Sequence, residues 1–390
     1  GFKSRPAHQT SNHERQCNGK ENFAYFNANL NMSIMSAPIK VGVAGYGISA
    51  KVYHIPFLDA LKEFEITAIL ERTKNEALQK HPSVKSARTI DELAADKETE
   101  LIVITTPNET HADYAAKALR AGKHVVLEKP FANTSAEAKE LIEIAKRSDG
   151  ILSVYQNRRY VSDYLTIKDI LAENLLGEVH TFNAHYDRYR AEARPNAWRE
   201  KDFPGSGILY DLGSHLIDQT LSLFGLPIAI TADIRMQRPH AKVDDYFDLW
   251  LDFGFMKAFL HAGMLVREPG PRYLVHGTRG SFVKPGEDVQ EGKLRAGEPP
   301  AGTDWGREPK AYYGLLHTEI NGEIVKKTIP SRQGDYGQYY KNIYQSIRHN
   351  APVLEKPEHG YNTIRLIELA IQSHKEKRTL ECSGLIDAYS

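Results

Sequence analysis

Two side chains in the second half of the chain have types and spacing suited to proton transfer. Asp211 and His215 lie four positions apart, so on a helix they share one face. A histidine held by a carboxylate can take or give a proton near neutral pH. Two other interpretations stay open: Asp211, His215 and Asp218 as metal ligands, although no second ligand cluster stands out, and a helix-capping aspartate beside a packed histidine. The spacing therefore marks a candidate acid–base pair.

A glycine-rich turn early in the chain could hold a phosphate group. Gly45-Tyr-Gly47-Ile-Ser-Ala50 follows a short apolar run and fits the pattern of dinucleotide-binding turns. Gly45 permits the tight turn, Gly47 lets a pyrophosphate approach the backbone, and Ala50 lets a helix pack close to a sheet. Free N–H groups at the helix start would then face the phosphates. The turn predicts dinucleotide binding, with a purely structural glycine turn as the alternative.

The residues after the second apolar run bear on the choice of cofactor. Glu71 follows Ala50 by about 20 residues, where an acidic residue would bind the ribose 2′-hydroxyl of NAD. Arg72 comes next and Lys74 is close by, and such cations can pair with the 2′-phosphate of NADP. A solvated charge cluster is a third interpretation. We expect NADP or NAD, and favour NADP for a reason given below.

Two loops follow apolar runs that are typical of parallel strands. Residues 105–111 (Thr-Thr-Pro-Asn-Glu-Thr-His) close one run, and Glu128-Lys129-Pro130 closes the next. Ligands of open parallel sheets lie at the carboxyl ends of the strands, so both loops are placed to meet a dinucleotide. A lysine there could bond a substrate hydroxyl next to the nicotinamide. The alternatives are Thr110 as a helix cap and Lys129 as an ordinary surface lysine.

These residues need a scaffold, and strand and helix alternate in the first part of the chain. The expected strands are Ile39–Ala44, Glu65–Leu70, Leu101–Thr106, His124–Leu127 and Ile151–Tyr155. The expected helices are Ser49–Ala60, interrupted near Pro56, then Lys74–Gln79, Asp91–Asp96 capped by Thr89 or Asp91, Thr110–Ala121 and Ser135–Arg147. The alternation predicts an NAD(P)-binding Rossmann domain over residues 36–155, with a doubly wound parallel sheet.

The rest of the chain changes to longer segments with a period of two. Expected strands are Val179–Tyr189, Ala229–Met236, Tyr246–Phe253, Lys257–Met264 and Arg272–Val283, with Gly254 turning the third into the fourth. Expected helices are Ser162–Glu173, Tyr210–Phe224, Tyr336–His349 and Gly360–Ser373, and Gly286–Pro309 is expected to be a loop. The pattern predicts an α/β domain over residues 156–390 whose antiparallel sheet has one covered face.

Length and composition set outer limits on function. The chain has 390 residues, which suits two domains, and its 50 Lys+Arg balance 50 Asp+Glu, so no broad charge attracts nucleic acid or an anionic membrane. Cys17 and Cys382 cannot form a disulfide framework, and the apolar runs are too short to span a bilayer. Residues 1–35 lack a signal-peptide core and predict a disordered tail or one added for expression. We expect a cytoplasmic protein without metal, membrane or nucleic-acid partners.

Together these motifs resemble the glucose–fructose oxidoreductase / inositol dehydrogenase (Gfo/Idh/MocA) family over residues 39–380. The resemblance is carried by the turn at residues 45–50, residues 105–111, Glu128-Lys129-Pro130 and Asp-Leu-Gly-Ser-His-Leu-Ile-Asp at 211–218. Further segments look like its NADP-dependent scyllo-inositol 2-dehydrogenase branch: Tyr53-His54-Ile-Pro56-Phe57, Tyr155-Gln-Asn-Arg158-Arg159, Trp198-Arg-Glu200 and Val275-His-Gly-Thr-Arg-Gly-Ser281. That branch is the reason for favouring NADP, and Glu71 departs from its pattern.

The resemblance implies a Rossmann domain followed by an α/β domain with an open, mostly antiparallel sheet. It also implies homodimers or homotetramers formed through the open sheet faces. By motif, the family's substrate lysine falls on Lys129, its catalytic pair on Asp211 and His215, and Asn157 and Arg158 would lie near the nicotinamide or substrate. The predicted cofactor-binding residues are Gly45, Tyr46, Gly47, Ile48, Ser49, Glu71, Arg72, Thr106, Pro107, Asn108, His111, Glu128, Lys129, Asn157 and Arg158.

The expected function is hydride transfer between a nicotinamide and the hydroxyl or ketone of a sugar or cyclitol. His215 would act as general acid or base, Asp211 would orient substrate hydroxyls and tune His215, and Lys129 would bond the reacting oxygen. The alternative is a non-catalytic dinucleotide-binding regulator that resembles the transcriptional co-repressor of galactose utilisation. The joint presence of Lys129, Asp211 and His215 favours an enzyme.

Overall fold

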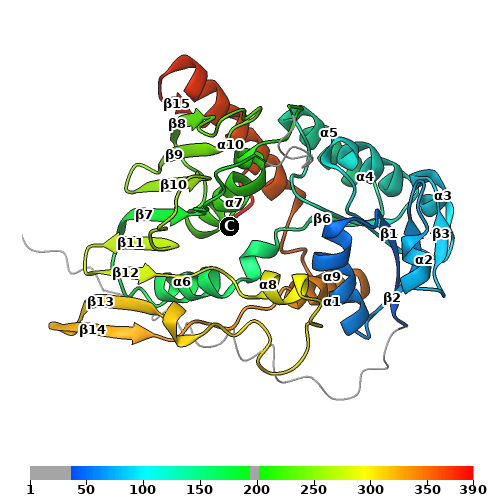
Figure 1. Ribbon diagram of the computed structural model, residues 1–390, viewed down its shortest axis with the longest axis horizontal. Helices are drawn as coiled ribbons and strands as arrows, with labels where there is room; N and C mark the ends of the chain where they lie inside the picture. Colours follow the sequence, from blue (N-terminus) through cyan, green and yellow to red (C-terminus); the bar gives the residue numbers. More distant parts are fainter. Residues whose placement is uncertain (1–36, 194–201, 390) are drawn as a thin grey trace, which may run out of the picture. The chain divides into compact units, whose positions relative to one another are not determined.

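The computed structural model describes residues 37–193 and 202–389, which form two β-sheets with helices around and between them (Figure 1). The predicted tail at residues 1–35 and the Trp198-Arg-Glu200 segment lie outside the described residues. Strands β1 to β6 make one sheet and β7 to β15 make the other. The sheets therefore divide along the sequence where its pattern changes from strand–helix alternation to a period of two.

The first sheet is parallel throughout, with the strand order β3-β2-β1-β4-β5-β6. This is the order of a dinucleotide-binding Rossmann sheet, so the fold predicted for the first half is confirmed. Only Ala87 is buried in β3, and no apolar run marks that strand in the sequence. The strands are β1 (Ile39–Ala44), β2 (Phe64–Leu70), β3 (Lys85–Ala87), β4 (Leu101–Ile104), β5 (His124–Leu127) and β6 (Leu152–Val154).

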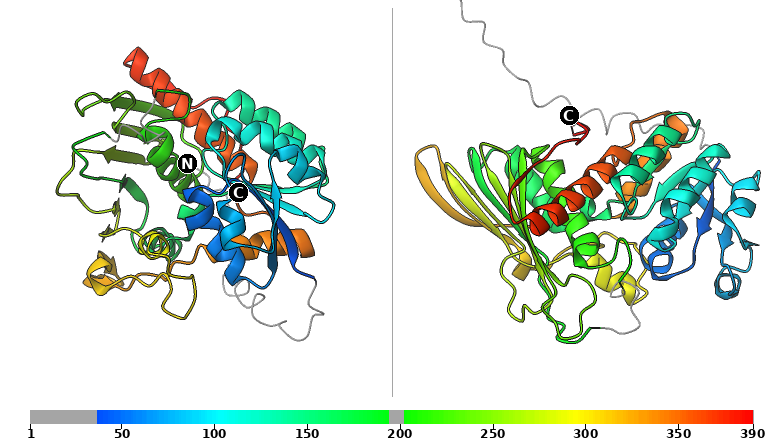
Figure 2. Two further views of the ribbon diagram at one scale, coloured as in Figure 1. Left: turned by 45° about the vertical axis from the view of Figure 1, so that its right-hand side comes forward. Right: turned by 90° about the horizontal axis from the view of Figure 1, so that it is seen from above.

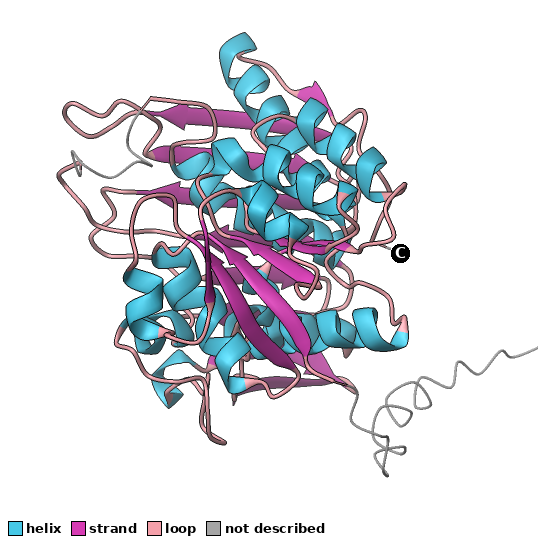
Figure 3. Ribbon diagram, turned by 90° about the vertical axis from the view of Figure 1, so that its right-hand side faces the viewer, coloured by secondary structure: helices cyan, strands magenta, loops and turns pink. Residues whose placement is uncertain are grey.

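Helices connect these strands and cover both faces of the sheet (Figure 3). The segment after the glycine turn changes from π-helix to α-helix next to Pro56, where the sequence predicts an interruption. Thr89 accepts a hydrogen bond from the Glu92 N–H and caps α3, as one of the two predicted caps. The helices are η1 (Ala50–His54), α1 (Ile55–Ala60), α2 (Glu76–Lys80), α3 (Ile90–Ala95), η2 (Asn108–Thr110), α4 (His111–Arg120) and α5 (Ser135–Ala145).

Burial on both faces explains why the strands of this sheet are continuous apolar runs. In β4, Leu101 and Val103 belong to a cluster with η1, α1 and α9 (Gly337–His349). Ile102 and Ile104 belong to a second cluster, with α3, α4 and α5. All four side chains are fully buried, so no polar residue interrupts the strand.

The second sheet has nine strands in the order β14-β13-β12-β11-β7-β10-β9-β8-β15. All its pairs are antiparallel except β7 with β10, so it is mixed but mostly antiparallel, as predicted. Gly254, at φ 82°, lies in the turn between β9 and β10, which confirms the expected hairpin. The first strands along the chain are β7 (Val179–His185), β8 (Ala229–Arg235), β9 (Tyr246–Asp252) and β10 (Lys257–Gly263).

The structure corrects two expectations for the second half and adds one hairpin that the sequence pattern does not predict. The single strand expected at Arg272–Val283 is a hairpin of β11 (Tyr273–Gly277) and β12 (Gly280–Lys284). The expected loop Gly286–Pro309 contains helix α8 (Gln290–Arg295), whose single buried apolar residue is too weak a pattern to detect. A hairpin of β13 (Gly314–Ile320) and β14 (Glu323–Ile329) turns at Asn321-Gly322, a recognisable turn signal. Leu316 is the one apolar side chain that β13 buries and β14 is mostly exposed, so no apolar pattern marks either strand.

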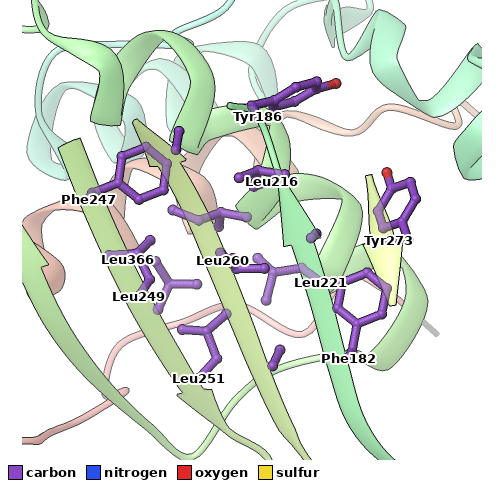
Figure 4. Packing of buried hydrophobic residues seen from close by; sticks show 14 of the residues in the cluster. Phe182, Tyr186, Leu216, Leu221, Phe247, Leu249, Leu251, Leu260, Tyr273 and Leu366 are labelled. Atoms are coloured by element: carbon purple, nitrogen blue, oxygen red, sulfur yellow. The ribbon is translucent and has the colours of Figure 1, made fainter. Parts of the chain in front are cut away.

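Helices pack on one face of the second sheet, between it and the Rossmann sheet (Figure 2). They include α7 (Ser214–Phe224) and α10 (Pro357–Glu376), and α10 also packs on α5 of the first half. Figure 4 shows Phe182, Leu249 and Leu260 meeting Leu216 and Leu366 in this core. Among the described residues no helix covers the opposite face. The remaining elements are η3 (Asn157–Tyr160), α6 (Ser162–Ala172), η5 (Leu209–Gly213), η6 (Lys310–Tyr312) and β15 (Leu380–Glu381).

None of the helices within residues 37–193 and 202–389 has the length and apolar character that crossing a membrane requires.

Candidate active site

The structure brings together the lysine and the aspartate that the sequence predicts to act on substrate. Lys129 follows β5, and Asp211 lies in η5, a π-helical segment that leads into α7. The Lys129 Nζ donates hydrogen bonds to the Asp211 carboxylate Oδ1 at 2.9 Å and to the Asp211 carbonyl at 2.8 Å. The two side chains are 14% and 28% exposed, so this ion pair is shielded from most solvent.

His215 lies in the first turn of α7, one helical turn beyond Asp211, and is buried. Burial and the charges of Lys129 and Arg158 hold the pKa of His215 well below its usual range, and the charge of Asp211 only partly opposes them. Its Nδ1 is buried and has no hydrogen-bond partner among the described residues. The imidazole is therefore neutral at pH 7 and ready to accept a proton. Asp211 lies inside η5, so it is not a helix-capping residue.

Asp244 fixes the start of the segment that carries this pair. Its carboxylate accepts a hydrogen bond from the Leu209 N–H at 2.7 Å, and its carbonyl accepts one from the Ile208 N–H at 3.1 Å. Gly207 has φ 85°, and a Cβ there would lie 2.0 Å from the Asp244 Oδ1, so only glycine fits. Burial raises the pKa of Asp244 to about 6. Gly207 thus lets the chain before Asp211 pass close to a buried carboxylate.

The glycine turn has the shape that a dinucleotide needs. Gly45 has φ 103°, and a Cβ there would lie 3.0 Å from the Thr105 Oγ1, so the turn requires glycine. A Cβ at Gly47 would meet nothing within 4 Å, which leaves open space over the backbone. Ile48 is 65% exposed and Tyr46 is partly buried. The residues present therefore fit a pyrophosphate at the start of this helix.

A buried carboxylate connects the glycine turn to the lysine. The Glu128 side chain accepts hydrogen bonds from the Ser49 hydroxyl, the His54 Nε2 at 3.0 Å and the Lys129 N–H at 2.9 Å. The His54 Nδ1 in turn lies 2.6 Å from the Tyr340 hydroxyl of α9. Burial would raise the pKa of Glu128, but these hydrogen bonds and the nearby cations hold it at about 2. The ionised carboxylate thereby fixes the backbone at Lys129 relative to the helix after the turn.

The residues predicted to choose between NAD and NADP have different environments. Glu71 is buried, and its Oε2 accepts a hydrogen bond from the Ala77 N–H at 2.7 Å, so this carboxylate holds the start of α2. Arg72 is exposed and has no partner among the described residues. Arg88 donates to the carbonyls of Glu71 and Lys74 and stabilises the loop around Arg72.

Polar side chains of the loop after β4 bind backbone carbonyls of the same loop and of two neighbouring loops. His111 is buried, with its ring nitrogens 2.9 Å from the Thr106 carbonyl and 2.7 Å from the Pro130 carbonyl. The Asn108 amide donates to the Gly205 carbonyl at 3.1 Å, and the Thr110 hydroxyl donates to the Pro107 carbonyl at 2.8 Å. The side chains of Asn108 and His111 therefore brace the loops around Lys129 and Asp211, whereas Thr106 and Pro107 lie at the carboxyl edge of the sheet.

Asn157 and Arg158, expected near the nicotinamide or substrate, lie in η3 after β6. Asn157 is buried, and no hydrogen bond holds its amide within the described residues. Arg158 donates to the Tyr336 hydroxyl at 2.7 Å and forms an ion pair with Glu291 of α8. Arg158 is near enough to His215 to lower the histidine's pKa.

Three positioning residues escape the sequence analysis. His54 belongs to a segment that carries the family resemblance, but the sequence assigns it no role. Asp244 lies just before β9, and Glu291 lies in the segment expected to be a loop. Each acts through a contact far along the chain, so no local spacing reveals it. Of the described residues, no group of three or more His, Cys, Asp and Glu side chains is arranged to hold a metal ion.

A Rossmann sheet with an open glycine turn, next to a lysine, an aspartate and a histidine from two domains, defines a dinucleotide-dependent oxidoreductase. The chain belongs to the Gfo/Idh/MocA oxidoreductase family. The family's NAD-binding Rossmann fold matches residues 39–156, and its C-terminal alpha/beta domain matches residues 168–382. The predicted family and enzyme class are thereby confirmed.

Similar proteins cover nearly the whole chain. Scyllo-inositol 2-dehydrogenase (NADP(+)) IolW of Bacillus subtilis is 44% identical over 88% of this chain and 95% of its own length. Uncharacterized oxidoreductase YdgJ of Escherichia coli is 41% identical over 89% of this chain and 99% of its own. The solved structure of the oxidoreductase yvaA from Bacillus subtilis aligns with a TM-score of 0.86 at 43% identity, and covers 89% of this chain and 99% of that one.

The buried Glu128 yields a stability prediction. Glu128→Gln places an amide among donors, and we expect it to lower the free energy of unfolding at pH 7 by about 3 kcal/mol. The wild-type advantage is complete above the unfolded pKa of 4.5 and is lost as pH falls toward the folded value of about 2. Urea unfolding at several pH values between 7 and 3 measures the difference in unfolding free energy between the wild type and Glu128→Gln. Glu143→Gln, at an exposed position on α5, is the control. A difference that does not shrink on acidification contradicts the assignment.

Proposed function

We propose that this protein is an NAD(P)-dependent dehydrogenase that interconverts a hydroxyl and a ketone on a sugar or cyclitol. The observation that carries the proposal is the contact of Lys129 with Asp211, beside a neutral His215. A cation, a carboxylate and a base together match what oxidation of an alcohol requires. The name of the relative IolW supports a cyclitol as the substrate.

Each side chain has a distinct role in the proposal. Lys129 binds the reacting oxygen and stabilises the negative charge that develops on it. His215 accepts the hydroxyl proton when the alcohol is oxidised, and returns it in the reverse direction. Asp211 fixes the Lys129 ammonium and orients substrate hydroxyls. A dinucleotide whose pyrophosphate is held by the turn at residues 45–50 would supply the nicotinamide as hydride acceptor or donor.

We infer a preference for NADP from the environments of Glu71 and Arg72. One oxygen of the Glu71 carboxylate is engaged by the Ala77 N–H, so it is less able to receive a ribose hydroxyl. Arg72 offers a free guanidinium at the end of β2, where the 2′-phosphate of NADP is bound in such sheets. The relative IolW carries NADP(+) in its name, which agrees with this preference.

We also infer that two copies of the chain associate through the uncovered face of the second sheet. One row of side chains on this face is in register across six strands, from Trp250 through Phe259, Asn183, Leu274 and Val283 to Leu315. Trp250 is 53% and Leu315 is 38% exposed. A stripe of this kind, apolar except at Asn183, is typical of an interaction site, and a second copy presents the same stripe.

The activity is tested by following the near-ultraviolet absorbance of reduced nicotinamide. Purified protein is offered NADP or NAD with a panel of inositols and sugars, and we expect turnover with at least one polyol. Cofactor binding without turnover on any of them contradicts the proposed function.

His215→Ala should lower turnover about 10²- to 10⁴-fold and leave dinucleotide affinity nearly unchanged. In wild-type protein, kcat/KM for alcohol oxidation should stay flat as pH falls through 6.5, because the depressed pKa keeps His215 neutral there. Fluorescence titration measures the affinity of His215→Ala for the dinucleotide. Steady-state rates at several pH values measure the pH profile of kcat/KM in the wild-type protein. His180→Ala, an exposed histidine, is the control, and full activity in His215→Ala would remove this residue from the mechanism.

Arg72→Gln should raise KM for NADPH about tenfold or more and leave KM for NADH nearly unchanged, because only the former carries the 2′-phosphate. Arg120→Gln, an exposed arginine at the end of α4, is the matched control. Steady-state kinetics with each cofactor measure the two KM values. An equal rise in KM for NADPH and NADH would argue against a phosphate contact at Arg72.

Trp250→Glu should shift the protein from an oligomer to monomer, because the charge interrupts the apolar stripe. Light scattering coupled to size-exclusion chromatography measures the mass. Leu354→Glu replaces a similarly exposed apolar residue away from the sheet and should leave the mass unchanged. A monomeric wild-type protein would contradict the association.

A further inference from the structure

Tyr186 follows the last residue of β7 and lies beside the candidate active site. Phe182 and Ala184 of this strand point to the covered face, and Tyr186 continues the alternation. Its ring contacts His215, with centroids 6.4 Å apart and planes at 71°. Figure 4 shows the Tyr186 hydroxyl pointing away from the apolar cluster below it. A phenol thus lies next to the predicted acid–base residue without belonging to any of the sequence motifs.

The Tyr186 hydroxyl makes no hydrogen bond to residues 37–193 or 202–389, although the residue is only 5% exposed. Other buried tyrosines have partners: the Tyr164 hydroxyl donates to Ser222 at 2.9 Å, and the Tyr339 hydroxyl donates to Ser153 at 2.8 Å. The Tyr186 oxygen is not among the fully buried atoms that lack a partner, so it keeps some access to solvent. A hydroxyl next to His215 that has no partner in the protein and is still accessible is placed to bind a ligand.

Arg272 holds the Tyr186 ring in place. Its guanidinium lies 3.6 Å from the ring centroid, and is itself fixed by hydrogen bonds to the His185 carbonyl at 2.8 Å and the Gln219 side chain at 3.0 Å. Burial raises the pKa of Tyr186, so the phenol is neutral at pH 7 and can donate as well as accept. The hydroxyl is thereby preorganised for a polar partner.

We propose that the Tyr186 hydroxyl binds the substrate, through a hydroxyl on a carbon next to the one that reacts. The inference rests on the proposed function, which places the reacting hydroxyl at Lys129 and His215. Sugars and cyclitols carry hydroxyls on adjacent carbons. When one hydroxyl reacts at His215, the Tyr186 hydroxyl beside it can bind the hydroxyl on the next carbon. An analogue that lacks this hydroxyl leaves the phenol unpaired and is a poor substrate. Tyr186 therefore selects polyols over simple secondary alcohols.

Tyr186→Phe removes only the oxygen and keeps the ring against Arg272. We expect kcat/KM for a polyol substrate to fall about ten- to hundredfold. For the analogue that lacks the adjacent hydroxyl, kcat/KM should not change, because no hydrogen bond is lost. The Tm of the free protein should stay nearly the same, because the variant loses no hydrogen bond within the protein.

Tyr164→Phe is the matched control, because it also removes one buried hydroxyl, but one with a partner in Ser222. It should lower Tm and leave kcat/KM unchanged, which is the opposite pattern. No loss in Tyr186→Phe, or an equal loss for the polyol and its deoxy analogue, overturns the role of Tyr186 while the proposed function stands. Wild-type protein without turnover on any polyol contradicts the proposed function and this inference with it.

Discussion

The ion pair of Lys129 and Asp211 is the interaction on which the candidate site depends. Lys129 is at the end of a strand in one sheet, and Asp211 is in a helical segment packed on the other. Both groups are largely withdrawn from solvent, so either charge alone would be poorly solvated. Their contact also brings His215 close enough to Lys129 for the cation to lower the histidine's pKa. One interaction thus joins the two halves of the chain and adds to the effect of burial, which is the larger cause of the low pKa of His215.

The C-terminal helices provide the framework for this contact. Helix α10 packs against α5 of the first half and against β8 and α7 of the second. Helix α9 adds Tyr339 and Tyr340 to the core on one face of the Rossmann sheet, and Arg348 forms an ion pair with Glu100 just before β4 at 2.8 Å. The last part of the chain therefore fixes two sheets formed by earlier parts. Nothing local to Lys129 or Asp211 could hold them within 3 Å.

The sequence predicts a structural feature correctly where the cause of that feature lies in the residue itself or in its neighbours along the chain. The strands β1 and β4 are apolar because both faces are buried, and Gly45 is required by its own backbone angle, so these features could be predicted. Contacts between residues that are far apart in the sequence could not be predicted in this way. The carboxylate of Glu71 lies where an acid could bind ribose, yet it also holds the Ala77 N–H, which depends on how α2 folds back. No apolar pattern marks strands β13 and β14, because Leu316 is the one apolar side chain that β13 buries and β14 is mostly exposed.

The candidate site departs from the usual rules of protein interiors at the places where chemistry is proposed. His215 has a buried nitrogen without a partner, and Asn157 and Tyr186 have polar groups that no described residue satisfies. The buried His215 nitrogen costs stability, which the three apolar clusters around the sheets must offset. Filling these polar positions with internal partners would stabilise the free protein and leave a polyol with nothing to bind. Buried polar atoms without a partner also occur elsewhere, as at Glu308 and Glu355, so the proposed site is marked by such groups lying next to Lys129 and Asp211.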